Sequence, residues 1–263
     1  MTSKQLENSI WGFILGDCWG VPYEFKSSEQ INFKPFDEYG TWRQPAGTWS
    51  DDTSLMLCLM DSFDGKRFDI NKQKQNLKDW VSNGKFTIDG LFDIGIGTRS
   101  AIYSDFSRNT ENELGNGGLL RCWLLFALER RDIDDWKEMV TLTHSYNLIA
   151  EQAFEFYALF YQMYSTGVLD TSFKEEFDIW IDKNKFLSIK TGTVVNCMKV
   201  VVDSLFAGFS LKEVIEKGGD TDSNGAVFGS LYYLQEDFPD EYKKKIRNWE
   251  YLEGVIEKFL LYH

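Results

Sequence analysis

The chain has 263 residues, of which 43% are hydrophobic and 26% charged, and its formal net charge is −13. This length and composition are those of a globular chain that buries a large core. With 41 acidic residues against 28 basic ones, such a chain gains little from counterion release on DNA or RNA, so we expect no general nucleic-acid binding. No run approaches the roughly 18 apolar residues of a membrane span, and we expect no membrane association.

Apolar residues recur at helical spacing along most of the chain. The pattern i, i+4, i+7, i+8 occurs first in residues 6–14 and again, in part, in residues 55–63. Later segments with the same spacing are residues 123–127, 153–160, 194–205 and 227–234. Glycine clusters separate the segments, and neither strand alternation nor a proline- or serine-rich linker occurs. We therefore expect an all-α fold, with a single compact multi-helix domain over residues 1–263.

Cysteine and histidine are scarce, which limits the chemistry available. The four cysteines are widely spaced without a C-x-x-C pair, and residues 1–5 are polar without a signal-type segment after them, so we expect a cytoplasmic protein. The only histidines are His144 and His263. A histidine-rich zinc site is therefore excluded, and a Ser-His-Asp triad would have to use His144. Any metal site must rely on oxygen ligands, which favours magnesium, manganese or calcium.

The first acidic cluster is the sequence T-W-S-D-D-T at residues 48–53, directly before an apolar helical segment. Ser50 is a good N-cap, and acids in a first helical turn suit the helix dipole, so the cluster is explained by a helix start alone. The same carboxylates, with the serine hydroxyl, would also suit a divalent cation. Both interpretations stay open.

The second cluster, G-G-D-T-D-S-N-G at residues 218–225, also precedes an apolar helix. It superficially resembles a calcium loop, but Leu231 stands where such a loop needs a bidentate Glu. If the two helices packed together, the four carboxylates of the two clusters would repel one another unless cations neutralised them. Two divalent ions would do so and leave positions for substrate oxygens. The sequence does not show whether the clusters meet.

Five motifs together resemble those of the ADP-ribosylglycohydrolase family. They are G-D-C-W-G-V-P-Y-E at 16–24, W-S-D-D-T at 49–53, L-G-N-G-G-L-L-R at 114–121, L-T-H at 142–144, and G-G-D-T-D-S-N at 218–224. Each motif alone is weak, but five in family order are specific. The resemblance implies an all-α fold with a binuclear Mg²⁺ or Mn²⁺ site.

The resemblance also implies roles for individual residues. The implied metal ligands are Ser50, Asp51, Asp52, Asp220, Asp222 and Ser223. The family commonly has Thr at the last position, but Ser keeps the hydroxyl. The implied catalytic residues are Glu24, Asp93 and Asp222, with Glu24 gating the site or acting on the catalytic water; otherwise it would be a solvated loop acid.

Substrate contacts are implied at three places. They are the helix start with Gly95, Gly97 and Thr98, whose N–H groups suit a pyrophosphate; the loop Asn116, Gly117 and Gly118; and His144. We assign His144 to substrate contact rather than proton transfer, although a lone His is equally often structural. Some relatives have an adenine-stacking aromatic residue where Leu114 stands, so Tyr103 or Phe106 would have to replace it, unless both belong to the core.

The resemblance implies hydrolysis of the glycosidic bond between ADP-ribose and a modified protein or small molecule. Asp93 lies in F-D-I-G (residues 92–95), which resembles the arginine-directed bacterial members, so we expect a preference for ADP-ribosyl-arginine. A plain helix cap is the competing explanation of Asp93. Alternative functions are a non-catalytic ADP-ribose-binding or structural member, and a phosphoesterase that uses the same metal pair. The sequence does not predict the oligomeric state.

Overall fold

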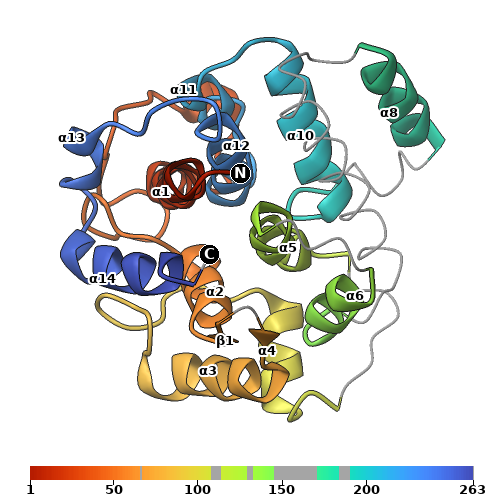
Figure 1. Cartoon of the computed structure of the whole chain (residues 1–263). Helices are drawn as coiled ribbons and strands as arrows, with labels where there is room; N and C mark the ends of the chain where they lie inside the picture. Colours follow the sequence, from red (N-terminus) through yellow and green to blue (C-terminus); the bar gives the residue numbers. More distant parts are fainter. Residues whose placement is uncertain (66, 108–113, 129–132, 145–170, 184–189, 263) are drawn as a thin grey trace.

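The computed structural model describes residues 1–65, 67–107, 114–128, 133–144, 171–183 and 190–262, and these residues are mostly helical (Figure 1). The helices are α1 (Ser3–Gly20), α2 (Asp51–Met60), α3 (Ile70–Asn83), α4 (Ile96–Tyr103), α5 (Gly117–Ala127), α6 (Ile133–Thr141), α8 (Thr171–Lys183), α10 (Val194–Phe206), α11 (Leu211–Ile215), α12 (Thr221–Tyr232), α13 (Asp240–Lys243) and α14 (Trp249–Leu260). Two short 3₁₀ helices, η1 (Val21–Tyr23) and η2 (Ser28–Gln30), follow α1. The expected all-α fold is confirmed, and the helix expected at residues 153–160 lies outside the described residues.

Strand structure within the described residues is confined to one small hairpin. Strands β1 (Phe63–Asp64) and β2 (Arg67–Phe68) pair antiparallel, with Phe63 opposite Phe68. The hairpin connects α2 to α3. The described buried apolar side chains form a single cluster, as the expected single domain requires, although the domain boundaries stay a prediction.

Helices α1 and α12 lie side by side at the centre of the fold (Figure 1). A Cβ added at Gly16 of α1 would lie 1.9 Å from the carbonyl oxygen of Gly225 in α12, and one at Gly12 would lie 2.3 Å from that of Gly229. Because no side chain separates the backbones there, the two helices approach more closely than helices with larger residues allow. Helix α12 begins at the second acidic cluster, and helix α1 ends beside it. The two helices are therefore in backbone contact at this place.

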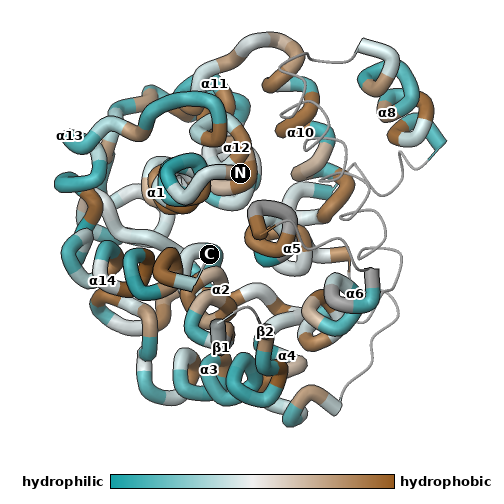
Figure 2. Tube along the Cα trace, viewed as in Figure 1, coloured by the Kyte–Doolittle hydropathy of each residue, from teal (hydrophilic) through white to brown (hydrophobic). Residues whose placement is uncertain are grey.

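Apolar and polar residues alternate along the outer helices, which Figure 2 shows as brown and teal stretches of the tube. In α14 the buried residues are Leu252, Ile256 and Phe259, at helical spacing. In α10 the predicted face is confirmed for Val194, Met198 and Val201, which are buried, while Leu205 is only partly buried against the core.

The structure also bears on the expectations about the cysteines and about membrane spans. Cys18, Cys58 and Cys197 are buried free thiols. Within the described part of the chain, no helix has both the length and the apolar character needed to cross a membrane.

Candidate metal centre and active site

The first acidic cluster begins helix α2. Ser50 is its N-cap, and the serine hydroxyl accepts a hydrogen bond of 3.2 Å from the Asp52 backbone N–H. The capping role predicted for Ser50 is therefore confirmed. The carboxylates of Asp51 and Asp52 are not used as caps, so both are available for other contacts.

The second cluster begins helix α12 in a different way. Asp220 occupies the N-cap position, but no side-chain hydrogen bond caps this helix. Instead, the Asp220 carboxylate accepts a hydrogen bond of 2.8 Å from the side-chain amide of Asn116. Asp220 and Asp222 are both buried, with 5% and 2% of their surface exposed. Asp220 is thus held in the interior without capping the helix, while Asp222 accepts a hydrogen bond of 3.0 Å from the Ser223 backbone N–H in the first turn.

The two clusters meet, which the sequence alone left open. The Ser223 hydroxyl donates a hydrogen bond of 2.9 Å to the Asp52 carboxylate, although these residues lie 171 positions apart. On the other side, carboxylate oxygens of Glu24, Asp220 and Asp222 lie within 4.8 Å of one another. Buried carboxylate and hydroxyl oxygens at this spacing are the donor set that Mg²⁺ and Mn²⁺ prefer, so the residues fit such a metal centre.

The electrostatics of the cluster also favour a cation. Burial, with the nearby Asp93 charge, raises the pKa of Glu24 to about 8. Burial, with the charge of Asp51, raises the pKa of Asp93 to about 8, and burial raises the pKa of Asp51 to about 7. The pKa values of Asp52 and Asp222 are raised well above normal, again mainly by burial. A cation among these groups would stabilise their ionised forms.

One acid that organises the site was not singled out from the sequence. Asp17, fully buried in α1, accepts hydrogen bonds from the backbone N–H groups of Ser50 (2.9 Å) and Thr53 (3.0 Å) and from the Thr53 hydroxyl (2.6 Å). Burial raises the pKa of Asp17 to about 6, although these hydrogen bonds oppose the shift. The available signal was an acid inside the apolar run of residues 10–21, because such a group needs partners.

The same turn of α1 also positions the second cluster. The Thr221 hydroxyl donates a hydrogen bond of 2.7 Å to the Gly20 carbonyl. A Cβ at Gly20 would lie 2.3 Å from the backbone nitrogen of Asp222, so a larger residue there would displace this aspartate. Helix α1 is therefore the common support that sets the distance between the two clusters.

The acidic residues line a cavity of about 460 Å³. The lining includes the predicted residues Glu24, Asp51, Asp52, Asp93, Gly95, Gly97, Thr98, Asn116, Gly117, His144, Asp220, Asp222 and Ser223. Gly118 is buried in α5, outside the lining of this cavity, and its predicted substrate contact stays a prediction.

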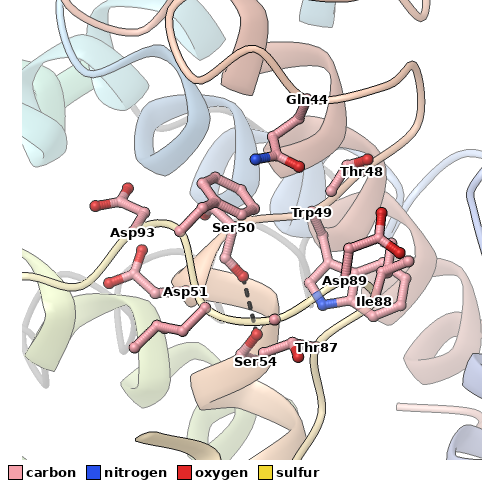
Figure 3. A pocket seen from close by; sticks show the side chains of 13 residues that line it. Gln44, Thr48, Trp49, Ser50, Asp51, Ser54, Thr87, Ile88, Asp89 and Asp93 are labelled. Carbon is pink, nitrogen blue, oxygen red and sulfur yellow. Dashed lines mark hydrogen bonds between the residues drawn. The ribbon is translucent and has the colours of Figure 1, made fainter. Parts of the chain in front are cut away.

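Ser50 lines a second, much smaller cavity beside the first, shown in Figure 3. Asp51 and Asp93 line both cavities, and both carboxylates point to the left in this view. The dashed line marks the Ser54 hydroxyl donating to the Ser50 carbonyl at 3.0 Å. Asp93 does not cap α4: the N-cap is Gly95, without a side-chain cap, and the Gly95 N–H donates to Asp51 at 3.1 Å. The helix-cap interpretation of Asp93 is therefore wrong.

His144 contributes a neutral ring to the cavity wall. Burial, followed by the charge of Arg121, lowers the pKa of His144 to about 3. The His144 Nδ1 lies 2.8 Å from the Thr143 hydroxyl, which itself accepts from Arg121. A Cβ at Gly115 would lie 3.0 Å from His144 Nε2, so glycine leaves space beside the ring. A neutral, fixed imidazole suits contact with a substrate better than proton transfer.

The aromatic residues of the cavity are not those suggested by the sequence. Tyr103 is 74% exposed and Phe106 packs partly against the core, and neither lines the cavity. The aromatic lining residues in the described part of the chain are Phe25 and Trp42, and Leu114 also lines the cavity. Their position in loops, outside any helical pattern, hid them from sequence analysis.

Comparisons with known proteins agree with this architecture. The sequence profile named ADP-ribosylglycohydrolase matches residues 3–263. The chain is 29% identical over 152 residues to the ADP-ribosylarginine hydrolase Tri1 of Pseudomonas putida (strain GB-1), which covers 53% of this chain and 41% of that protein. It is 32% identical over 124 residues to the ADP-ribosylarginine hydrolase Tri1 of Serratia proteamaculans (strain 568), covering 44% and 34%. The matched region thus spans less than half the length of either relative.

A solved structure has the same fold. The chain superimposes with a TM-score of 0.74 on a chain of an ADP-ribosylglycohydrolase-related protein complex, covering 99% of this chain and 97% of that one. The identity is 19%, so this likeness concerns the fold.

Proposed function

The chain belongs to the ADP-ribosylglycohydrolase family, and from that premise we propose that it is a hydrolase that releases ADP-ribose from a modified arginine side chain. The observation that carries the proposal is the convergence of both acidic clusters and Glu24 in one large cavity. The names of the two curated relatives, ADP-ribosylarginine hydrolase, support the arginine linkage. The substrate would be an ADP-ribosylated protein or a small ADP-ribosyl compound.

The metal ligands of the proposed enzyme come from both helix starts. They are Ser50, Asp51, Asp52, Asp220, Asp222 and Ser223, which would hold two Mg²⁺ or Mn²⁺ ions. When bound, such ions polarise substrate oxygens and lower the pKa of a water molecule toward neutrality. The Asp17 carboxylate would keep the first ligand segment in place through its hydrogen bonds to Ser50 and Thr53.

The remaining chemistry belongs to side chains that handle protons and orient the sugar. Glu24 and Asp93 line the cavity beside the proposed metal ligands, where each carboxyl would accept or release a proton during cleavage. Asp222 would act with them beside the reacting carbon. The negative charge of the surrounding carboxylates would stabilise the oxocarbenium-like charge that develops on the ribose during cleavage.

Another part of the cavity lining would bind the rest of ADP-ribose. Gly97 and Thr98 bring backbone N–H groups in the first turn of α4 to the cavity, where they would bind the pyrophosphate, while the N–H of Gly95 is held by Asp51. Asn116, Gly117 and neutral His144 lie on the same cavity wall and would contact the sugar. The buried free thiols favour a reducing compartment, and we therefore also propose a cytoplasmic location.

Product analysis tests this function. Purified protein with Mg²⁺ is incubated with peptides that carry ADP-ribose on arginine or on serine, and the products are separated by chromatography. We expect free ADP-ribose, formed faster from the arginine linkage. Release of AMP or phosphate would instead indicate a phosphoesterase, and no release from any linkage would indicate a non-catalytic member.

A further inference from the structure

Aromatic side chains gather at one edge of the large cavity. Trp42 lies between Phe25 and Phe92. Its ring centroid is 6.3 Å from that of Phe25, at an interplanar angle of 65°, and 6.0 Å from that of Phe92, at an angle of 53°. These are the distances and tilted geometries of attractive ring pairs. We call Phe25, Trp42 and Phe92 the aromatic rim. Phe25 and Trp42 line the large cavity, while Phe92 lines the smaller one beside it.

The conformation of Phe25 is not explained by core packing. Its side chain is 64% exposed, and its backbone φ is 64°, in the left-handed region that a bulky residue rarely adopts. The Phe25 N–H donates a hydrogen bond of 2.7 Å to the Gly219 carbonyl, which ties this strained residue to the second acidic cluster. Other aromatic residues with a positive φ, Phe36, Phe86 and Phe106, do not line the cavity, so the exposure of the ring at the cavity, rather than its backbone angle, marks Phe25 as a surface for a ligand.

The aromatic rim is fixed to the reacting end of the cavity. The Trp42 indole N–H donates to the carboxylate of Glu24, a member of the triangle with Asp220 and Asp222. Asp93, the neighbour of Phe92 in sequence, lines the same cavity as Glu24, and its charge contributes to raising the pKa of Glu24. A group bound against Phe25 and Trp42 would therefore lie beside two carboxyl groups and close to the proposed metal ligands.

The chemistry of this corner matches a planar cation. Within the described residues that line the large cavity, there is no lysine or arginine, so its charge is wholly acidic. A guanidinium group stacks on aromatic faces and pairs with carboxylates through its positive charge, which a neutral adenine ring lacks. Adenine also lies at the far end of ADP-ribose from the bond that is cleaved, while the guanidinium of a modified arginine is attached at that bond.

We propose that Phe25 and Trp42, together with Glu24 and Asp93, form the subsite that receives the arginine guanidinium of the substrate. This inference rests on the proposed hydrolase function and names the residues that select its linkage. The aromatic faces would bind the guanidinium, and the adjacent carboxyl groups would favour it over the neutral oxygen of an ADP-ribosyl-serine.

The kinetic test uses Phe25→Leu, which keeps an apolar side chain but removes the aromatic face. The matched control is Tyr103→Leu, another exposed aromatic residue that does not line the cavity. With Mg²⁺ present, we expect Phe25→Leu to lower kcat/KM for an ADP-ribosyl-arginine peptide about 3- to 30-fold, the range for a cation–π contact. Inhibition by free ADP-ribose, which lacks the guanidinium, should stay unchanged, and Tyr103→Leu should behave as the wild type. Equal loss of ADP-ribose affinity in Phe25→Leu would place the ring against ADP-ribose, and an unchanged kcat/KM would leave it without a role; either result overturns the proposal.

A binding test separates this inference from the hydrolase function. The protein is saturated with Mg²⁺ and ADP-ribose, then titrated by calorimetry with agmatine, a guanidinium compound, or with its neutral carbamoyl analogue. We expect agmatine alone to bind, and Phe25→Leu to weaken its binding at least about threefold. If no linkage is cleaved but agmatine binds in a Phe25-dependent way, the guanidinium subsite is supported and the proposed hydrolase function is wrong. If ADP-ribose is released but agmatine binding is absent or independent of Phe25, the subsite is wrong and the hydrolase function stands.

Discussion

The α1–α12 pair, which supports the acidic clusters, and the aromatic rim belong to the same site but are built in opposite ways. The helix pair is buried, and its backbones touch at Gly16 and Gly225. The rim lies in loops, exposes Phe25 and holds it in a strained backbone conformation. Close packing fixes the carboxylates to within a narrow range of positions, which metal chemistry requires. The exposed rim is free to differ among proteins that share this core, so we expect the core to define the reaction and the rim its target.

Loss of a core carboxylate should have the largest effect. We expect Asp222→Asn to lower turnover at least about 10²-fold, comparable to the loss of one preorganised electrostatic group. Without divalent ions the melting temperature should not fall, because the variant removes a carboxyl group whose ionisation is opposed by burial and by the neighbouring carboxylates. Asp182→Asn, on the exposed surface of α8, serves as the matched control. Near-full activity of Asp222→Asn would remove this residue from the metal site.

The second largest effect is expected from a methyl group placed between α1 and α12. We expect Gly16→Ala to lower the free energy of unfolding by about 1–3 kcal/mol or more, because the new Cβ would lie 1.9 Å from a backbone oxygen. Gly254→Ala in α14 is the control, since a Cβ there meets no atom within 4 Å. The control should gain up to about 1 kcal/mol, as alanine favours helices over glycine. Urea unfolding curves measure both, and equal stabilities would contradict the close packing.

The link between the regions is tested by Trp42→Phe. This change keeps a ring but removes the indole N–H that donates to Glu24. We expect about a 10-fold fall in kcat on an ADP-ribosyl-arginine substrate, in line with a lost hydrogen bond to a charged group. Free ADP-ribose should bind as before. A change in stability without a change in kcat would show that the Trp42 contact only supports the loop.

The smallest expected effect is the pH dependence of stability without divalent ions. The pKa values of Glu24 and Asp93 are raised to about 8 in the folded protein and that of Asp51 to about 7, so the folded state binds more protons than the unfolded state. The free energy of unfolding should therefore fall as pH rises toward 8. His144, whose pKa is lowered from 6.5 to about 3, acts in the opposite direction below pH 6.5. Between pH 6.5 and 8 the opposing contribution of His144 is absent. Thermal melts over this range should show a melting temperature that declines as pH rises and that Mg²⁺ restores. A melting temperature that rises across this window would contradict the assigned shifts.

Sequence analysis recovered the buried half of the site better than the exposed half. Apolar spacing predicted helices such as α10 and α12, and each acidic cluster stands at a helix start as expected. It did not show that Ser223 reaches Asp52, because that contact depends on the packing of α1 against α12. Asp17 escaped notice, since its role appears only when α2 is placed beside α1. Phe25 and Trp42 carry no periodic signal at all, because loop residues meet the cavity through tertiary structure.

The claim that the two acidic clusters form one metal-dependent catalytic centre is tested most directly by ADP-ribose release with and without divalent ions. Wild-type protein is stripped with EDTA, and free ADP-ribose from an ADP-ribosyl-arginine peptide is measured before and after Mg²⁺ or Mn²⁺ is returned. We expect no release from stripped protein, full release on return of the metal, and a metal-dependent gain of about 2.7 kcal/mol in the free energy of unfolding at a hundredfold excess over Kd. Equal release with and without the metal, together with an unchanged melting temperature, would contradict the account.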